Sequence, residues 1–149
     1  MIKEALMRIV KYWFDYTDTL SVMHIGGGML YEAIEKAYPN AQIIFTDDIY
    51  HLATQKTMNT LLGMNVLKFA KFKNNERDCD DYSFGIMGIM RWIVPGFAFG
   101  IVHVDSVNGR HALNFFLDEE KRLYYFEPQT NTIKLMKMGR KYKPYLFII

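Results

Sequence analysis

Cys79 is the residue with the clearest chemical potential, because it is the only cysteine among the 149 residues. Asp78, with Asp81 three positions later, resembles a partial capping box, so a helix is predicted to begin at Cys79. The N–H groups and the dipole of a helix N-terminus stabilise a thiolate, whereas the charges of Asp78, Asp80 and Asp81 oppose it. Cys79 is therefore a candidate nucleophile, and a small buried thiol is the alternative.

His111 begins a predicted strand, and Glu127 ends the next strand of the same hairpin. If Leu117 pairs with Lys121, His111 lies directly opposite Glu127, with Cβ atoms about 4.5–5.5 Å apart. The other side chains on this face are apolar, so we expect the face to be core and to cover the helix that begins at Cys79. Cys79, His111 and Glu127 would then converge as nucleophile, base and orienting carboxylate. A core histidine and an edge carboxylate are the alternatives.

Three short motifs around these residues resemble those of transglutaminase-like cysteine enzymes. Residues 78–83 are similar to the nucleophile segment, residues 111–114 to the His-Ala-aromatic strand, and residues 126–130 to the apolar-Asp-Pro-Thr segment. The motifs follow the family's order and cover about a third of the chain. The sequence departs from the family where Glu127 replaces aspartate and Leu113 replaces the aromatic residue.

The resemblance implies a cysteine-dependent acyl-transfer enzyme that hydrolyses or transamidates an amide through a Cys-His-Glu triad. In that mechanism Cys79 attacks the carbonyl, His111 deprotonates the thiol and later protonates the leaving amine, and Glu127 holds the imidazole. The implied substrate is a protein or peptide amide. The alternative is a catalytically silent transglutaminase-like binding or assembly module, phage- or microbe-encoded, with an adhesive surface to which 10 Met residues contribute.

The sequence contains two candidates for the donor that would stabilise the oxyanion of an acyl-transfer reaction. The papain-like version of the family has a Gln a few residues before the Cys, but residues 73–75 are Lys-Asn-Asn. The side-chain amides of Asn75 and Gln55 are the two candidates for this role.

No metal or other cofactor is expected. The three aspartates around Cys79 offer oxygen ligands, together with His111, but they are nearly contiguous and a helix start would splay them. Acidic residues are also common at helix N-termini without any metal.

Helices are predicted in the first half of the chain. Apolar side chains recur at three- and four-residue intervals from Ile2 to Trp13 and again from Leu30 to Tyr38. Residues 46–48 are a candidate N-cap for a third helix, which Gly63 would end. The helix from Cys79 to about Trp92 is apolar nearly all round and is expected at the domain centre. The stripe from Ile2 to Trp13 is too apolar to remain solvated, so this first helix is expected to dock on the rest.

Strands dominate the second half. Runs of β-branched and aromatic residues alternate with turn signals such as Asn108-Gly109. The candidate strands are residues 42–45, 97–107, 111–117, 122–126, 132–136 and 145–149. We therefore expect the α+β class, with N-terminal helices and the Cys79 helix packed on an antiparallel β-sheet, the papain-like arrangement that the resemblance implies.

The composition is that of one globular domain, residues 1–149. Hydrophobic residues make up 50% and charged residues 23%, which excludes global disorder, and a single Cys excludes a disulfide scaffold. A net charge of +2 is too small to indicate nucleic acid, and no apolar run is long enough for a membrane span. With no recognisable signal peptide, a cytoplasmic location is expected, either in a cell or within a virus-infected one.

Overall fold

The computed structural model describes residues 23–149 except for 64, 70, 74–75, 77 and 138–141. The predicted helix from Ile2 to Trp13 lies outside the described residues. The described elements are β1 (Met23–Gly26), α2 (Gly27–Ala37), β2 (Gln42–Ile44), β3 (Ile49–Leu52), α3 (Gln55–Gly63), the 3-10 helix η1 (Val66–Phe69), α4 (Cys79–Ile93), β4 (Phe99–Ser106), β5 (Gly109–Leu117), β6 (Leu123–Glu127), β7 (Thr132–Leu135) and β8 (Tyr142–Ile148). None of the helices among these residues is long and apolar enough to cross a membrane.

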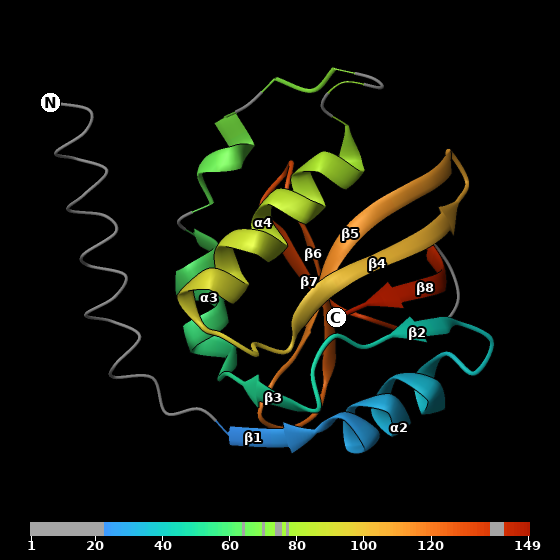
Figure 1. The fold of residues 1–149 in the computed structure, drawn as a ribbon. Coiled ribbons are helices and arrows are strands. Elements are labelled where there is room, and N and C mark those ends of the chain that lie inside the picture. The colour runs from blue at the N-terminus through green and yellow to red at the C-terminus, as the bar shows by residue number, and fades with distance from the viewer. Residues whose placement is uncertain (1–22, 64, 70, 74–75, 77, 138–141) are drawn as a thin grey trace, which may run out of the picture.

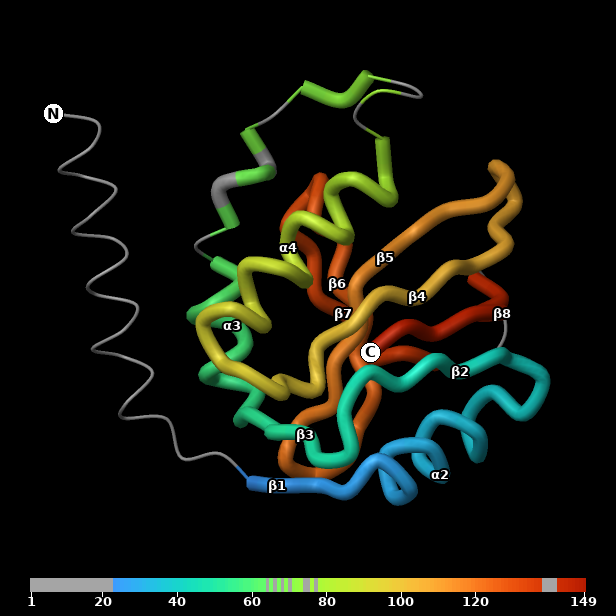
Figure 2. The backbone as a smooth tube through the Cα atoms, in the orientation of Figure 1, coloured from blue at the N-terminus to red at the C-terminus, as the bar shows by residue number. Residues whose placement is uncertain are grey.

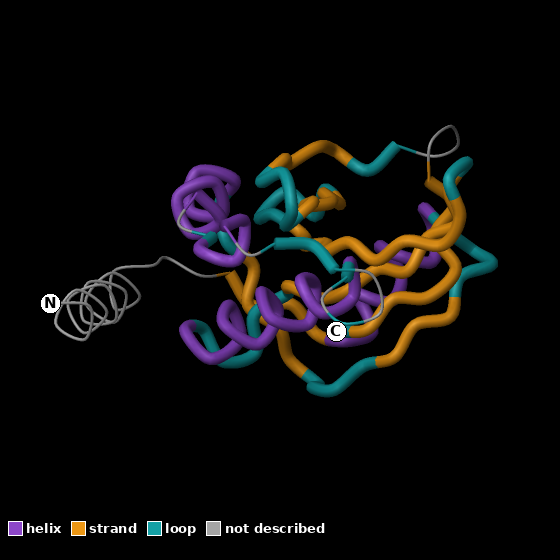
Figure 3. The backbone as a smooth tube through the Cα atoms, turned by 90° about the horizontal axis from the view of Figure 1, so that it is seen from above, coloured by secondary structure: helices purple, strands orange, loops and turns teal. Residues whose placement is uncertain are grey.

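Most of the described elements are strands, and six of them form one sheet in the order β2-β8-β4-β5-β6-β7 (Figure 1). Strand β8, near the C-terminus, lies between β2 and β4 (Figure 2). All neighbours in this sheet are antiparallel except β2 and β8, which pair in parallel. The expected antiparallel sheet is therefore wrong in this respect: the sheet is mixed, and β1 and β3 form a separate two-stranded sheet. Several strands run side by side in the view from above (Figure 3).

Both faces of the large sheet are buried, and each has its own hydrophobic cluster. Leu113 and Phe115 of β5 belong to the cluster that includes Leu30 of α2. Phe116, which points the other way, belongs to the cluster that includes Ile86 of α4. The expectation that the face of Leu113 and Phe115 covers the Cys79 helix is thus wrong. Every β5 residue from 112 to 117 is buried, so alternation along the strand did not distinguish the two faces.

The helix predicted after residues 46–48 begins later than expected. Strand β3 intervenes, and α3 starts at Gln55, where the Thr54 hydroxyl accepts a hydrogen bond from the Thr57 N–H at 3.0 Å. Thr46 is engaged elsewhere, because its hydroxyl accepts a hydrogen bond from Arg91 at 2.8 Å. Thr46, which local propensity predicts to be a helix cap, therefore takes part in a tertiary hydrogen bond instead.

Helix α4 begins at Cys79 as predicted, and the capping box of Asp78 and Asp81 is present. Its buried side chains are Tyr82, Ser83, Ile86 and Met90. The prediction that this apolar helix is buried at the domain centre is wrong for one side, because Phe84, Ile89 and Trp92 are exposed. Helix α4 thus has one face on the sheet and one apolar face outside the core.

Candidate functional site

The β5–β6 hairpin brings His111 and Glu127 together. Its register pairs Leu117 with Leu123 and not with Lys121, so His111 lies diagonal to Glu127 rather than directly opposite. A shift by two residues leaves both side chains on the same face of the sheet. The His111 Nε2 atom lies 2.6 Å from the Glu127 Oε2 atom, which is the distance of a strong charge-assisted hydrogen bond.

Cys79, the first residue of α4, lies against this pair. The Cys79 thiol is the largest of the causes that raise the pKa of His111 to about 9. The hydrogen bond to Glu127 acts in the same direction, while burial of the imidazole opposes both. His111 is therefore an imidazolium near neutral pH, held between a sulfur atom and a carboxylate.

Buried hydrogen bonds position α4 against the sheet. The Ser83 hydroxyl donates to the Cys79 carbonyl at 2.8 Å. The side-chain amide of Asn114 donates to the carbonyls of Ser83, at 2.9 Å, and of Gly100, at 3.1 Å. Sequence reasoning missed Asn114, although a fully buried amide inside the apolar run of β5 is the signal that marks it.

The aspartates around Cys79 are less repulsive than their number suggests. The Asp78 N–H donates to the Asp81 carboxylate at 3.1 Å. A hydrogen bond with Asp78 is the main cause that raises the pKa of Asp80, so the Asp80 carboxyl group retains a proton more readily than an isolated one. Ligand atoms of Asp78, Cys79 and Asp80 lie within 4.8 Å of one another, closer than the splayed arrangement expected from the sequence.

Of the two oxyanion candidates, Gln55 is not brought to the pair of His111 and Glu127. Gln55 lies two residues after Ala53, which bridges to Asp118 just beyond the far end of β5 from His111. Seven residues of strand span about 23 Å, so Gln55 is near the opposite end of β5. Asn75 is outside the described residues.

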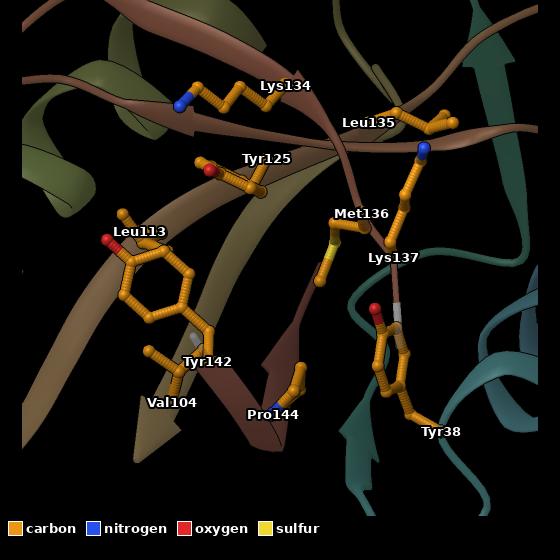
Figure 4. A pocket seen from close by; sticks show the side chains of 10 residues that line it. All are labelled: Tyr38, Val104, Leu113, Tyr125, Lys134, Leu135, Met136, Lys137, Tyr142 and Pro144. Carbon is orange, nitrogen blue, oxygen red and sulfur yellow. The ribbon is translucent and has the colours of Figure 1, made fainter. Parts of the chain in front are cut away.

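A cavity of about 390 Å³ adjoins the His111 site. It is lined by Tyr38, Val104, Leu113, Tyr125, Lys134, Leu135, Met136, Lys137, Tyr142 and Pro144 (Figure 4). The Tyr142 ring lies 6.2 Å from the His111 ring and 5.5 Å from the Tyr125 ring, between centroids. A second hollow of about 240 Å³ shares Tyr38, Tyr142 and Pro144 with the first. Sequence reasoning missed this cavity, because its lining comes from segments about 100 residues apart.

Comparison with known proteins identifies a family. The model of the ricin-type beta-trefoil lectin C-terminal domain matches residues 29–148. Among solved structures, the complex of PSL1a with E64 superposes with a TM-score of 0.72 at 21% identity, over 85% of this chain and 51% of that chain. The Polyporus squamosus lectin bound to the human-type influenza-binding epitope Neu5Acα2-6Galβ1-4GlcNAc has a TM-score of 0.69, also at 21% identity, over 85% and 49%. The chain thus spans about half the length of these structures. No curated protein matches it.

These matches correct the family predicted from the sequence. The resemblance to transglutaminase-like and papain-like cysteine enzymes is wrong as an assignment, because the family model that matches is that of the ricin-type beta-trefoil lectin C-terminal domain. The expected papain-like fold is replaced by a mostly β fold with few helices, shared with these structures. The same findings overturn the prediction of a cysteine protease-like hydrolase or acyl-transfer enzyme with a catalytic triad for peptide amides. The predicted alternative, a binding module, agrees better with them, although not as a transglutaminase-like one.

The family match takes in most of the described chain. It includes all six strands of the large sheet, helix α4 and the residues that line the cavity. The chain belongs to the family of ricin-type beta-trefoil lectin C-terminal domains.

Proposed function

We propose that this chain is a carbohydrate-binding module whose ligand occupies the tyrosine-lined cavity. The observation that carries the proposal is the lining: Tyr38, Tyr125 and Tyr142 face one cavity together with Lys134 and Lys137 (Figure 4). Among the described residues that line it, none is acidic. Membership of a lectin family and the glycan bound to the Polyporus squamosus lectin support this choice of ligand class.

The lining matches the surface of a sugar. A pyranose ring has an apolar C–H face and a rim of hydroxyl groups, and tyrosine offers a flat apolar ring with a hydroxyl that donates and accepts. The lysine ammonium groups add donors for hydroxyl or carboxylate oxygens. Because the second hollow shares Tyr38 and Tyr142, the surface extends beyond one ring and suits an oligosaccharide.

Titration of the folded chain with Neu5Acα2-6Galβ1-4GlcNAc and with Galβ1-4GlcNAc, followed by NMR chemical shifts, tests the proposal. We expect saturable binding with shifts at the cavity, weakened roughly tenfold or more by Tyr142→Ala through loss of ring contact. Tyr31→Ala is the matched control, because Tyr31 is an exposed tyrosine of α2 that does not line the cavity. Absence of saturable binding across a panel of acidic and neutral glycans contradicts the proposal, and so does an equal loss in the control.

A second proposal concerns Cys79, His111 and Glu127, which we infer form a reactive-thiol site beside the cavity. The 2.6 Å contact of His111 with Glu127 favours it, and so does the effect of Cys79 on the pKa of His111, which requires the thiol to lie close to the imidazole. A cysteine beside a histidine that a carboxylate orients is the arrangement found in nucleophilic thiol sites. In this arrangement Glu127 orients and stabilises the imidazolium, and Cys79 bonds to an electrophilic carbon.

Alkylation by iodoacetamide measures this reactivity. The Cys79 sulfur forms a bond to the CH₂ carbon, and iodide leaves with the electron pair of the broken C–I bond. We expect the folded chain to react much faster at pH 6.5 than the urea-unfolded chain, and Glu127→Gln and His111→Asn to slow the reaction, as followed by intact mass. E64, the compound in the PSL1a complex, serves as a second probe. A folded-state rate no higher than the unfolded rate contradicts a reactive thiol.

A further inference from the structure

Helix α4 carries an apolar face that no described residue covers. Phe84 and Trp92 are eight positions apart and therefore lie along one side of the helix, with Ile89 beside them. These side chains are 49%, 75% and 37% exposed, respectively. We call this surface, defined by Phe84, Gly88, Ile89 and Trp92, the α4 outer face. An exposed tryptophan and phenylalanine on one ridge are typical of an interaction surface.

Gly88 lies at the centre of the α4 outer face. A Cβ atom at this position would meet no atom of the described residues within 4 Å, so nothing in the core requires glycine here. Glycine inside a helix is destabilising relative to alanine, because it loses more backbone freedom on folding. A glycine between Phe84 and Trp92 leaves a notch on this side of the helix, into which another helix can pack closely.

We propose that the N-terminal segment from Ile2 to Trp13 docks as a helix on the α4 outer face. Its apolar residues recur at helical spacing and form one stripe, which needs a partner surface. Twelve helical residues are about 18 Å long and α4 is about 22 Å long, so the two match in length. Packing of the apolar stripe on the α4 outer face removes both surfaces from water.

The path of the chain allows this docking. His24 of β1 pairs with His51 of β3, and His51 bridges to Phe97, which follows the end of α4 closely. Two strand spacings of about 4.8 Å thus bring β1 within about 10 Å of Phe97. Residues 14–22 extend up to about 30 Å, which is enough to reach the Trp92 end of the outer face.

Charge favours one direction for the segment. With Trp13 near Trp92, the segment runs parallel to α4, and its Lys3 approaches Asp80 and Asp81, which are exposed at the start of α4. This places a cation beside two carboxyl groups. The reverse direction would place Lys3 at the far end of the helix.

The two tryptophans of the chain, Trp13 and Trp92, both belong to the proposed contact. In the full chain with Trp13→Phe, Trp92 is the only tryptophan, so its emission wavelength and its quenching by acrylamide report on the outer face alone. We expect a blue-shifted emission and weak quenching. Adding Leu6→Asp and Ile9→Asp, which place charge in the apolar stripe, should shift the emission to the red and raise the quenching constant severalfold.

The matched control is Lys11→Gln in the same background, because Lys11 is on the polar side of the segment and the emission should stay unchanged. Phe84→Asp provides a test from the α4 side, since Phe84 is two helical turns from Trp92, and it should produce the same red shift. Circular dichroism establishes that each variant is folded. Equal quenching of Trp92 in all variants overturns the docking. Shielding of Trp92 that rises with protein concentration also overturns it, in favour of a second copy of the chain.

Discussion

The two ends of the β5–β6 hairpin each hold a carboxylate next to a cation, but they differ in the burial of the carboxylate and in the type of cation. At the turn, Asp118 is fully buried and accepts hydrogen bonds from the Glu120 N–H at 3.0 Å, the Arg122 N–H at 2.9 Å and the Arg122 Nε at 2.8 Å. At the open end, Glu127 is partly accessible and accepts from the Gln129 N–H at 3.2 Å and from His111.

The type of cation distinguishes the two pairs: the ion pair of Arg122 with Asp118 is permanent, whereas that of His111 with Glu127 depends on pH. Arginine keeps its charge throughout the physiological range, so Arg122 and Asp118 form a permanent bond that closes the turn. Histidine can lose its charge, and with a pKa of about 9 His111 does so above neutral pH, so its contact with Glu127 responds to protonation. The same strand pair thus combines a rigid end with an adjustable one.

Asp118→Ala is expected to have the largest effect of the changes considered. It removes every bond that the carboxylate makes, leaves turn N–H groups without their acceptor, and should lower the free energy of unfolding by about 3 kcal/mol. Urea unfolding measures this loss. Glu120→Ala is the control, because it removes only an exposed ion pair with Arg122 and should cost no more than about 0.5 kcal/mol. A loss at Asp118 as small as that of the control would show that the turn does not depend on its carboxylate.

His111, at the open end of the hairpin, should make the free energy of unfolding depend on pH. Since the folded pKa of His111 is about 9, above its ordinary 6.5, its contribution is complete below pH 6.5 and is lost as pH rises through 9. One pKa unit corresponds to about 1.4 kcal/mol, and solvent access weakens the full effect, so we expect a loss of about 2 kcal/mol. Urea unfolding at several pH values should show this decline in the parent chain and a flatter profile in His111→Asn. Parallel profiles would exclude His111 as the titrating group.

The partners of His111 should be separable by NMR titration of its ring. Cys79→Ala removes the largest cause of the raised pKa and should lower the pKa of His111 by about one unit or more. Glu127→Gln should lower it by less. The reverse ranking would mean that the carboxylate and not the thiol dominates the site.

The smallest effect is expected at the helix start. Asp78→Ala removes the N-cap of α4 and should lower the melting temperature by an amount equivalent to about 1 kcal/mol. At a pH above 9, where His111 is uncharged, Cys79→Ala should leave the melting temperature nearly unchanged, because the two side chains are similar in size. A large loss for Cys79→Ala with a neutral Asp78→Ala would show that Cys79 supports the core and that Asp78 is not a cap.

Local chemistry was readable in the residues around Cys79. The capping box and the start of α4 depend on neighbours within three positions, and they were predicted correctly. The shared face of His111 and Glu127 also followed from alternation along the strands. The pairing register of β5 with β6 could not be predicted in this way, because the Asp118 side chain organises the turn and Lys121 adopts a positive φ of 60°. A five-residue connection then replaces the expected shorter one.

The family shows the limit of short motifs. Three motifs over a third of the chain suggested a transglutaminase-like enzyme, whereas the matched family is that of lectin C-terminal domains. A few residues around a helix start and a hairpin specify local geometry, and the same local geometry occurs in different folds.

The sequence by itself determined the elements whose hydrogen bonds and periodicity are local: the start of α4, the strands of the second half and the Asn108-Gly109 turn. Only the tertiary structure decided which face of β5 meets α4, the parallel pairing of β2 with β8, and the cavity between Tyr38 and Tyr142. The parallel pairing and the cavity join residues about 100 positions apart, and the contact of β5 with α4 joins residues such as Asn114 and Ser83, which are 31 positions apart. Their free energy comes from burial of apolar surface, which is non-directional and leaves no periodic mark on the sequence.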